Sequence, residues 1–471
     1  MYGNFPKETD RKVHRPLLPS NHGYKAELIF ADQTVPVVLG DYTSFGFSLI
    51  SDEQYDELCF PGQITVIQFS PLIEQQYAIK AQIIEMDRVN NQLRISLRVM
   101  ADSFKQVPKY RAIPLTGSHR LTGQIFHPFQ YKTLSFFEIN EVSKEGFLVS
   151  GIQPEFTLFT NMEIAFNLGM FQPSNPIRGR VSSIKFHADG TVQCFIHIIK
   201  KLPPVLTDNL NKYLMRYTSS TPEEIRNAGF AVKTVKEFIQ YKYVETQADY
   251  EAVLRTRRFA YSGVNKIDAE ANLEKVSYFF DDYSHILMVM HNDEIIGSAT
   301  IIVGDGNQKP FEIQTFFDKN ALTDLPPSAE TLEIAALCLH PDYRDTDILH
   351  GIFEQIYMLT MMLNKNYIIA SSDKYLLNLY QSIGFKLTEH EFIQPKYNDL
   401  AMHVLVIHRD AAIRAKGVKK LIWWPLWGIV NSHLIKKRVI RYRHWERIKA
   451  KLLRKSFKVM FFIRYRRHWQ D

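Results

Sequence analysis

The chain has 471 residues, of which 45% are hydrophobic and 23% charged. This length suggests two to four domains, and the composition is that of a folded globular protein and excludes large-scale disorder. The cysteines Cys59, Cys194 and Cys338 lie far apart, without a C-x-x-C pair or a histidine cluster. This excludes a disulfide framework and a structural zinc site, and we expect no metal. The polar N-terminus and the lack of an 18-residue apolar run predict neither a signal peptide nor a membrane span, hence a cytoplasmic protein.

The net charge of +7 is unevenly distributed along the chain. Residues 411–471 hold 18 Lys/Arg and two acids, which leaves 39 bases and 48 acids in residues 1–410. The C-terminal segment also contains all five tryptophans: Trp423, Trp424, Trp427, Trp445 and Trp469. An acidic body therefore ends in a basic, tryptophan-rich tail, which needs an explanation of its own.

Short alternating segments dominate the first 205 residues. Six of them between residues 26 and 99 are typical of the strands of a small antiparallel barrel, and six more between 123 and 199 repeat the rhythm. We predict a first β-barrel domain over residues 1–103 and a second over residues 104–205.

Two short motifs mark the first barrel: Arg11-Lys-Val-His-Arg15 before it, and Asp41-Tyr-Thr43-Ser-Phe-Gly46 after its second strand. Arginine forks can grip phosphates and guanine bases, and glycine permits a close backbone approach. In this order the motifs resemble the PilZ domain, with Thr43 in place of the usual Ser. The resemblance implies that Arg11, Arg15, Asp41, Thr43 and Gly46 bind cyclic di-GMP as a regulatory ligand. The alternative is a barrel of this family that has lost its ligand.

The second barrel carries a weaker version of the same pattern. Glu141-Val-Ser143-Lys-Glu-Gly146 stands at the turn, with Glu in place of Asp, and Arg111 alone precedes it instead of an R-x-x-x-R motif. We predict that this second, degenerate PilZ-like barrel is structural, a packing or dimerising partner.

Residues 206–240 are predicted to form a helical linker, because Leu202-Pro-Pro204 ends the barrel pattern and Ser219-Ser-Thr-Pro222 is typical of a helix start. From residue 241 to 410 the pattern is that of an α/β domain with a mixed central sheet. A strand begins at Lys242, Tyr250–Tyr261 is helical, and residues 284–303 form a strong β-hairpin pattern.

The stretch Leu332–Phe385 organises this α/β domain. A buried strand from Ile334 to Leu339 ends at His340-Pro341, and Arg344 precedes a helix. The apolar face of that helix is Ile348, Ile352, Ile356, Leu359 and Leu363. A second strand and a helix carrying Tyr380 follow. Such a strand–turn–helix unit offers backbone N–H groups to an anionic ligand.

The order strand, H-P-x-Y-R, helix and L-Y-x-x-x-G-F resembles the GNAT N-acyltransferase superfamily. The resemblance implies that Arg344 and the N–H groups near Leu337 and Leu339 bind an acyl thioester, and that Tyr380 protonates the departing thiolate. The corresponding loop here reads Arg344-Asp345-Thr346-Asp347-Ile348-Leu349, without the glycines of the family. An acyl carrier protein with its phosphopantetheine arm is therefore expected as donor in preference to free acyl-CoA.

The segment that begins at Glu333 resembles the branch containing long-chain N-acyl amino acid synthases and acyl-homoserine-lactone synthases, with Ala336 in place of that branch's Arg. The resemblance makes Glu333, directly or through water, the candidate base for an acceptor amine. It also places Arg257 and Tyr261 at the acceptor site, where an Arg could hold an amino-acid carboxylate. The open alternatives are an ion pair between Glu333 and Arg257, a solvated Arg257, and a packing role for Tyr380.

Residues 411–471 are predicted to be a basic amphipathic docking tail. The apolar run Leu421–Val430 is too short to span a bilayer. Its tryptophans and the bases that follow suit an anionic membrane surface, the inner face of the cytoplasmic membrane, or an acidic acyl carrier protein. The candidate docking residues are Trp423, Trp424, Trp427, Lys436, Lys437 and Arg438. Nucleic acid is disfavoured because no nucleic-acid-binding motif is present.

These predictions combine into two hypotheses. The first is a cyclic-di-GMP-responsive N-acyltransferase that moves a long-chain acyl group from acyl carrier protein to an amino acid or a similar amine. The alternative is a membrane-attached cyclic-di-GMP effector whose GNAT fold has lost catalysis and which acts by binding partners. Acyl-homoserine-lactone synthesis would need an S-adenosylmethionine site that the sequence does not identify.

Overall fold

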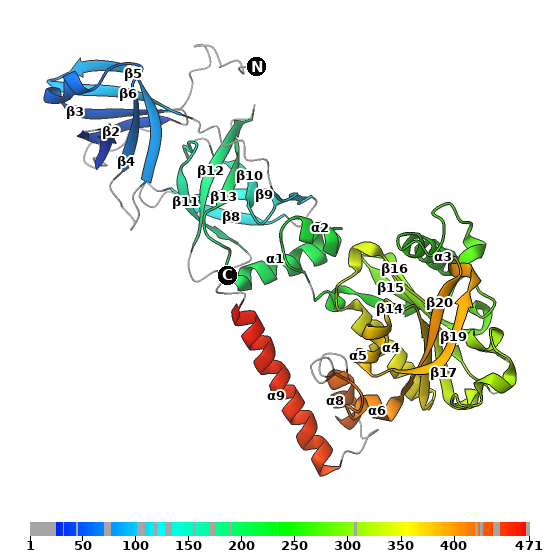
Figure 1. Ribbon diagram of the computed structural model, residues 1–471. Coiled ribbons are helices and arrows are strands. Elements are labelled where there is room, and N and C mark those ends of the chain that lie inside the picture. Colours follow the sequence, from blue (N-terminus) through cyan, green and yellow to red (C-terminus); the bar gives the residue numbers. More distant parts are fainter. Residues whose placement is uncertain are drawn as a thin grey trace. The chain divides into compact units, whose positions relative to one another are not determined.

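The computed structural model describes residues 25–467, apart from 32, 44–45, 70–76, 101–108, 117–119, 128–133, 154–155, 170–175, 188–190, 233, 306–308, 420–422, 424–426 and 437–442. The chain forms two compact units. The first comprises the residues up to Ser220 together with Glu224–Ala231, and the second comprises Thr221–Glu223 and the residues from Val232 onward (Figure 1).

The first unit begins with a closed antiparallel barrel. Its strands are β1 (Lys25–Ile29), β2 (Thr34–Thr43), β3 (Gly46–Asp52), β4 (Ile64–Phe69), β5 (Tyr77–Val89) and β6 (Gln92–Val99), in the order β1-β2-β3-β6-β5-β4. A 3₁₀ turn, Glu53–Leu58, follows β3. Alternate residues point inward, so that Leu28, Leu49, Ile67 and Ile95 are fully buried in the barrel core.

A second barrel follows with the same topology. Its strands are β8 (Thr122–Phe126), β9 (Leu134–Val142), β10 (Gly146–Ile152), β11 (Glu163–Leu168), β12 (Ile177–Phe186) and β13 (Val192–Ile198). They close in the order β8-β9-β10-β13-β12-β11, and the short β7 (Ile113–Pro114) adds to β9. Strand for strand this matches the first barrel, which confirms the two barrels expected from the repeated pattern.

Two helices follow the second barrel, α1 (Pro204–Tyr217) and α2 (Pro222–Asn227). The N–H of Arg111, in the second barrel, donates to the carbonyl of Asn227 at 3.1 Å. The Asn211 side chain on α1 donates to the carbonyl of Ala231 at 3.0 Å. The end of α2 is therefore fastened to the barrel by backbone hydrogen bonds, and most of the predicted linker is part of the first unit.

The second unit is built on a seven-stranded mixed sheet. Its strands are β14 (Gln240–Tyr243), β15 (His285–His291), β16 (Glu294–Val303), β17 (Thr331–Leu339), β18 (Tyr367–Ser372), β19 (Lys386–Gln394) and β20 (Leu400–His408), in the order β14-β15-β16-β17-β18-β20-β19. Only β17 and β18 pair in parallel, because α4 connects them. This sheet confirms the predicted α/β domain, although the sequence analysis did not predict β19.

Four helices accompany this sheet: α3 (Gln247–Ser262), α4 (Ile348–Met362), α5 (Leu377–Ile383) and α6 (Arg409–Ile413). A capping box formed by Thr246 and Asp249 begins α3. The predicted apolar face of α4 is confirmed for Ile348, Ile352, Ile356 and Leu359, all of which are buried. The connections contain short 3₁₀ turns: Lys236–Phe238, Leu273–Val276, Asp281–Tyr283, Ile313–Thr315, Lys319–Leu322, Ser328–Glu330, Pro341–Tyr343 and Pro395–Tyr397.

The C-terminal segment corrects the prediction of a tryptophan docking surface. Trp423 and Trp427 are each 1% exposed. The indole Nε1 of Trp423 donates to the carbonyl of Ala412 at 3.0 Å, and that of Trp427 donates to the carbonyl of Ile383 at 3.2 Å. The Trp427 ring packs on Tyr357 of α4, with 4.7 Å between ring centroids. These two tryptophans are core residues of the second unit, whereas Trp424, Lys437 and Arg438 lie outside the described residues.

Helices α8 (Ile429–Lys436) and α9 (His444–Arg467) complete the second unit, and Lys436 is exposed at the end of α8. Among the described residues, no helix has the length and apolarity needed to cross a membrane.

The buried position of Trp427 predicts a stability effect. Trp427→Phe removes the donor to Ile383 and part of the contact with Tyr357, so the free energy of unfolding should fall by about 2 kcal/mol. Trp445→Phe is the matched control, because Trp445 is 79% exposed on α9; it should change stability by less than about 0.5 kcal/mol. Urea unfolding followed by circular dichroism measures both. Equal effects of the two substitutions would contradict the core assignment.

Candidate functional site

A β-bulge interrupts the central strand β17. The pairing with β16 matches Ser298 with Cys338 but Thr300 with Ala335, so β17 contains one extra residue. Ala336 sits at this bulge with a φ of 46°, a left-handed conformation that alanine rarely adopts. Strand β18 pairs with β17 only as far as Ile334, opposite Ala370. Beyond the bulge, β17 and β18 therefore no longer pair.

This opening offers a backbone donor at the end of β17. The N–H of His340 donates to the carbonyl of Ile296 at 2.7 Å, on the β16 side. Because successive N–H groups of a strand point to opposite sides, the N–H of Leu339 points toward the β18 side, where pairing has ended. Leu337 is half-buried beside the bulge. The structure thus places the two predicted donor-binding leucines at the unpaired part of the strand.

The loop after β17 uses one of its acids internally. The carboxylate of Asp347, before α4, accepts hydrogen bonds from the N–H groups of Val235 and Lys236 at 2.7 and 3.0 Å. Asp345 is exposed with a φ of 59°. Arg344 donates to the carbonyl of Ala260 at the end of α3, at 3.1 Å. Arg344 therefore joins the loop to α3, and Asp345 is the exposed acid of the loop.

Glu333, the candidate base, is fully buried on β17. Its Oε2 accepts a hydrogen bond from the N–H of Glu312 at 2.6 Å, and its Oε1 accepts one from the N–H of Ile313 at 3.2 Å. Burial, and then the neighbouring Glu312, raise the pKa of Glu333 well above its ordinary value, against the lowering effect of these N–H donors. Glu333 does not pair with Arg257, which excludes that alternative.

Glu312 forms the second carboxyl of this buried acid pair. It is 5% exposed, and its Oε1 accepts a hydrogen bond from Gln394 at 2.7 Å. Burial raises the pKa of Glu312 to about 7, although the Gln394 hydrogen bond and the Lys396 charge lower it. Two buried acids, each with a raised pKa, therefore influence each other in the core.

Replacing Glu312 with Gln should stabilise the protein at alkaline pH. Its pKa of about 7 in the folded state lies above the ordinary 4.5, so its contribution to stability is complete below pH 4.5 and is lost as pH rises through 7. Glu312→Gln keeps an acceptor for Gln394 and should raise the free energy of unfolding at pH 8 by about 1–3 kcal/mol. Urea unfolding from pH 5 to 8 measures this. The exposed control Glu389→Gln should follow the wild type; if Glu312→Gln does so too, the buried-acid assignment is wrong.

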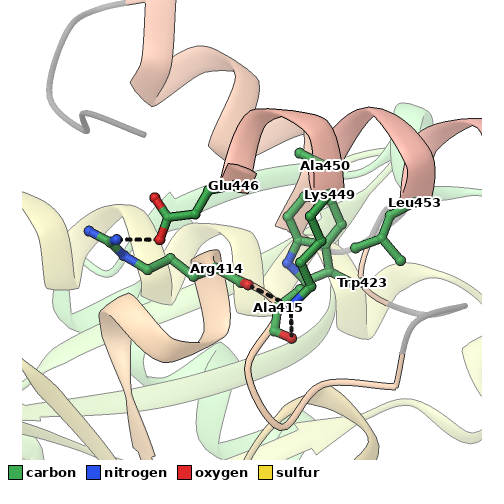
Figure 2. A pocket seen from close by; sticks show the side chains of 7 residues that line it. All are labelled: Arg414, Ala415, Trp423, Glu446, Lys449, Ala450 and Leu453. Atoms are coloured by element: carbon green, nitrogen blue, oxygen red, sulfur yellow. Dashed lines mark hydrogen bonds and ion pairs between the residues drawn. The ribbon is translucent and has the colours of Figure 1, made fainter. Parts of the chain in front are cut away.

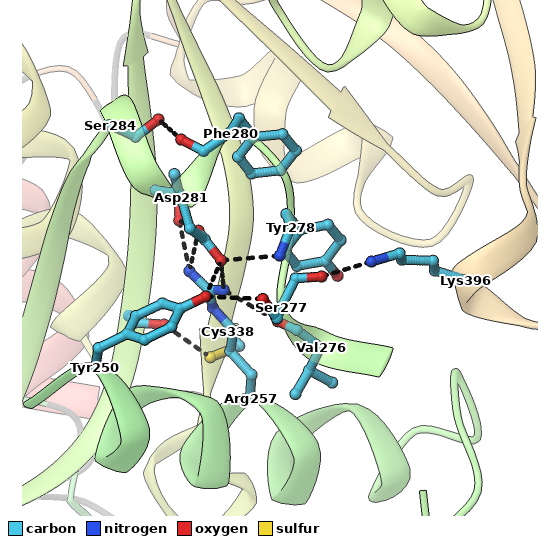
Figure 3. A network of polar contacts seen from close by, with 12 residues as sticks. Tyr250, Arg257, Val276, Ser277, Tyr278, Phe280, Asp281, Ser284, Cys338 and Lys396 are labelled. Carbon is cyan, nitrogen blue, oxygen red and sulfur yellow. Dashed lines mark hydrogen bonds and ion pairs between the residues drawn. The ribbon is translucent and has the colours of Figure 1, made fainter. Parts of the chain in front are cut away.

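Arg257 corrects the predicted acceptor site. Its side chain is fully buried, and its guanidinium binds Asp281 through two hydrogen bonds of 2.7 and 3.0 Å (Figure 3). It also donates to the Val276 carbonyl and the Thr300 hydroxyl. Burial alone would lower the pKa of Arg257, but the hydrogen bonds and charge of Asp281 raise it. The carboxylate that Arg257 binds is internal, and the alternative of a solvated Arg257 is excluded by its burial.

Asp281 is the centre of this network and was not identified from the sequence. Besides Arg257, it accepts hydrogen bonds from the Tyr250 hydroxyl at 3.0 Å and from the N–H of Tyr278 at 3.0 Å (Figure 3). The only sequence signal is an Asp-Asp pair before the β15–β16 hairpin, which is also typical of an ordinary turn.

Tyr261 lies in a chain of buried hydroxyl groups. The hydroxyl of Tyr278 donates to that of Tyr397 at 2.6 Å, and Tyr397 donates to Tyr261 at 3.4 Å. Burial raises the pKa of Tyr261 well above its ordinary value. The three tyrosines pack in one apolar cluster with Ala336 and Cys338 of the β17 bulge. This hydroxyl chain lies against the strand that carries Leu339, so Tyr261 remains close to the opening in the sheet.

Tyr380, the candidate acid, is 4% exposed on α5. Its ring packs edge-on against Phe353 and Phe385, with centroids 5.8 and 5.3 Å away. Burial, and then Asp373, raise the pKa of Tyr380 above its ordinary value, so the phenol stays protonated. No hydrogen bond joins its hydroxyl to another described residue. A protonated phenol is the form that a thiolate-protonating acid requires.

The turn motif of the first barrel is described in part. Asp41 pairs with Arg94 at 3.1 Å, and Arg94 also donates to Ser48. Arg11, Arg15 and the side chain of Thr43 lie outside the described residues. A Cβ at Gly46 would lie 2.1 Å from the Leu97 carbonyl oxygen, and one at Gly146 would lie 2.2 Å from that of Ile196. The neighbouring strand therefore requires both glycines, whether or not a ligand binds.

The residue between Asp41 and Thr43 joins the two barrels. The hydroxyl of Tyr42 lies 2.9 Å from Nε2 of His127, and the ring of Phe159 packs edge-on against Tyr42. Burial lowers the pKa of His127 to about 4, so this imidazole is neutral at physiological pH. The predicted ligand turn thus also contributes to the packing between the barrels.

The second unit thus contains a mixed sheet whose parallel pair, β17 and β18, opens at a bulge. Residues 254–354 match the family model described as an acetyltransferase (GNAT) domain. The second unit therefore carries a GNAT acyltransferase fold. The matched residues lie outside the barrels, so the PilZ resemblance stays a prediction. A search of curated proteins found no match to the chain.

Solved structures similar to part of the chain were also found. FeeM, an N-acyl amino acid synthase from uncultured soil microbes, is 11% identical, with 38% of this chain and 94% of that chain covered and a TM-score of 0.32. MesI, a CoA-dependent acyl-homoserine lactone synthase, is 19% identical, with 38% of this chain and 95% of that chain covered and a TM-score of 0.28. A GNAT family acetyltransferase from Elizabethkingia anophelis with acetyl-CoA bound is 14% identical, with 37% of this chain and 99% of that chain covered and a TM-score of 0.25.

Proposed function

We propose that the protein is an N-acyltransferase that moves a long-chain acyl group from a carrier-protein thioester to the amine of an amino acid or a similar small molecule. The observation that carries this proposal is the bulge at Ala336, where β17 and β18 stop pairing and the N–H of Leu339 faces the gap. A thioester carbonyl bound there would receive a fixed donor as negative charge develops on its oxygen.

The remaining steps need little covalent chemistry from the protein. Holding the thioester beside the amine supplies much of the rate through proximity. The amine nitrogen attacks the thioester carbon and loses a proton, while the C–S bond breaks and the thiolate gains a proton. Glu333, acting through water because it is buried, takes the first proton, and Tyr380 gives the second. Arg344 lies on the donor loop. Tyr261 remains the candidate for binding the acceptor amine, because the Arg257 side chain is paired with Asp281.

The carrier-protein donor is proposed because the loop before α4 lacks glycines and exposes Asp345, which would repel a free diphosphate. Acyl-CoA is the less favoured donor. We also propose that the basic C-terminal segment, with Lys436 exposed, holds the protein at the inner face of the cytoplasmic membrane.

The test is a product assay. The purified full chain is incubated with long-chain acyl carrier protein or acyl-CoA and a panel of amino acids and small amines, and the lipid extract is analysed by mass spectrometry. An N-acyl product that forms faster from the carrier protein supports the proposal. The absence of product across donors and amines would overturn it.

A partner-binding effector without catalysis is the second candidate. The observation that favours it is that the candidate catalytic groups already have partners within the protein. Both Glu333 oxygens accept hydrogen bonds from backbone N–H groups, and the Arg257 guanidinium is paired with Asp281. This candidate predicts nucleotide-dependent capture of a partner without turnover in the same assay.

The first barrel is proposed to bind cyclic di-GMP through Arg11, Arg15, Asp41, Thr43 and Gly46, and to regulate the second unit. Arg15→Ala should weaken binding of cyclic di-GMP by at least tenfold, because a charge-assisted contact to phosphate or guanine contributes about 1.5–3 kcal/mol. Isothermal titration calorimetry measures the affinity. Arg120→Ala, an exposed arginine of the second barrel paired with Glu138, is the control and should bind as the wild type does. Unchanged affinity in Arg15→Ala would remove the assignment.

A further inference from the structure

Helix α9 packs on the second unit through the side that carries Glu446, Lys449 and Leu453. Glu446 pairs with Arg414 at 2.5 Å, and Lys449 donates to the carbonyl of Ala415 at 3.2 Å (Figure 2). Leu453 is 7% exposed and lies with Trp423 in the small pocket between α9 and the body of the unit. These contacts set the rotation of the helix about its own axis, and hence which of its residues face outward.

An apolar stripe faces outward on α9. Trp445, Leu452 and Val459 are 79%, 59% and 57% exposed. They are seven residues apart, and a helix of 3.6 residues per turn brings positions at this spacing back to one side with only a small drift. Ile448, half-buried, falls on the same side. Three large exposed apolar residues in one line indicate a surface that binds another molecule or a membrane.

A basic face lies beside this stripe. Arg447, Lys451 and Arg454 are spaced four and three residues apart and are exposed, and Lys458 continues the spacing in the sequence. At 100° per residue this row lies about 120° around the helix from the apolar stripe, and the fixed face occupies the remaining side. The helix therefore presents three distinct sides: one fixed, one apolar and one basic.

From this arrangement we infer that α9 is the membrane-docking element of the protein, with the stripe Trp445, Leu452 and Val459 inserted at the lipid–water boundary of an anionic bilayer and the row beginning at Arg447 and Lys451 at its headgroups. This inference deepens the membrane attachment proposed above and moves it from the buried Trp423 and Trp427 to α9. Apolar and aromatic side chains beside Lys/Arg are the composition of interfacial helices.

Charge selects this occupant over a second copy of the chain. Helix α9 contains nine Lys/Arg and one acid, Glu446, which is already paired with Arg414. Two such helices face to face would bring like charges together, whereas an anionic lipid surface complements them. The apolar stripe favours lipid over a soluble polyanion. Nucleic acid would bind the Lys and Arg side chains through its phosphates and would leave Leu452 and Val459 exposed to water.

The test is co-sedimentation of the full chain with vesicles of phosphatidylcholine, with and without 30% phosphatidylglycerol. We expect binding to the anionic vesicles only, and at least tenfold weaker binding for Leu452→Ser/Val459→Ser and for Arg447→Gln/Lys451→Gln. Met362→Ser and Lys386→Gln are the matched controls, since Met362 is 78% exposed and Lys386 is exposed on β19; they should bind as the wild type does. Circular dichroism checks that every variant is folded.

Three results would overturn the inference: no binding of the wild type to anionic vesicles, unchanged binding of Leu452→Ser/Val459→Ser, or a dimer in sedimentation velocity that this double variant abolishes without an effect on vesicles. Vesicle binding needs no turnover. A protein that binds vesicles but forms no acyl product would therefore keep this inference and refute the proposed enzyme activity.

Discussion

Asp281→Asn is expected to lower the free energy of unfolding by about 3–5 kcal/mol, because it leaves the fully buried Arg257 guanidinium without its counter-charge. The substitution keeps the shape of the side chain. It removes the negative charge, however, and replaces one acceptor oxygen with an N–H₂ group that faces other donors. Among these donors are the N–H of Tyr278 and the Tyr250 hydroxyl. The defect is therefore electrostatic and hydrogen-bonding, not steric.

The adjacent residue supplies the control for this prediction. Asp282 is exposed, so Asp282→Asn should change the free energy of unfolding by less than about 0.5 kcal/mol. Thermal and urea unfolding of the two variants at pH 7 measure the difference. A loss below about 1 kcal/mol in Asp281→Asn would mean that Arg257 finds other partners, and the acceptor role for Arg257 would return as a candidate.

The barrels could be predicted from the sequence because the pattern that marks each strand lies within the strand itself. Strand alternation with a period of two, as in the buried Val35, Val37 and Leu39 of β2, is visible without knowledge of any partner strand. The repeated turn around Gly46 and Gly146 was visible too, and the structure gives its cause, the close approach of a neighbouring strand. Strand β19 lacks this signal, because most of Lys386–Gln394 is exposed or half-buried.

The polar core of the second unit could not be predicted, because its pairs are set by tertiary structure. Arg257 on α3 meets Asp281, which lies in a 3₁₀ turn before β15, and nothing in either segment marks the other. The same holds for the tryptophans. Composition identified a tryptophan cluster near lysines, but Trp427 is buried because Tyr357 and the carbonyl of Ile383 provide a site for it. Trp445, on the outward side of α9, stays exposed.

Glu333→Gln is expected to reduce kcat/KM for acyl transfer by about 100-fold or more, the usual contribution of a general base. Because Gln offers one acceptor oxygen to the two N–H groups of Glu312 and Ile313, some loss of stability is also expected, and activity must be measured where the variant is folded. Glu389→Gln, at an exposed site of β19, is the matched control and should keep full activity. Retention of activity in Glu333→Gln within threefold would place the base elsewhere.

The pH profile separates a base from a residue that only holds the fold together. A base must be deprotonated to act, and burial together with Glu312 raises the pKa of Glu333. Activity of the wild type should therefore rise with pH as Glu333 loses its proton. Glu312→Gln removes the neighbouring acid, which lowers the pKa of Glu333 and should move this rise to lower pH. A merely structural Glu333 would leave the position of the rise unchanged in Glu312→Gln. An unmoved profile would therefore refute the assignment of Glu333 as the base even if Glu333→Gln were inactive.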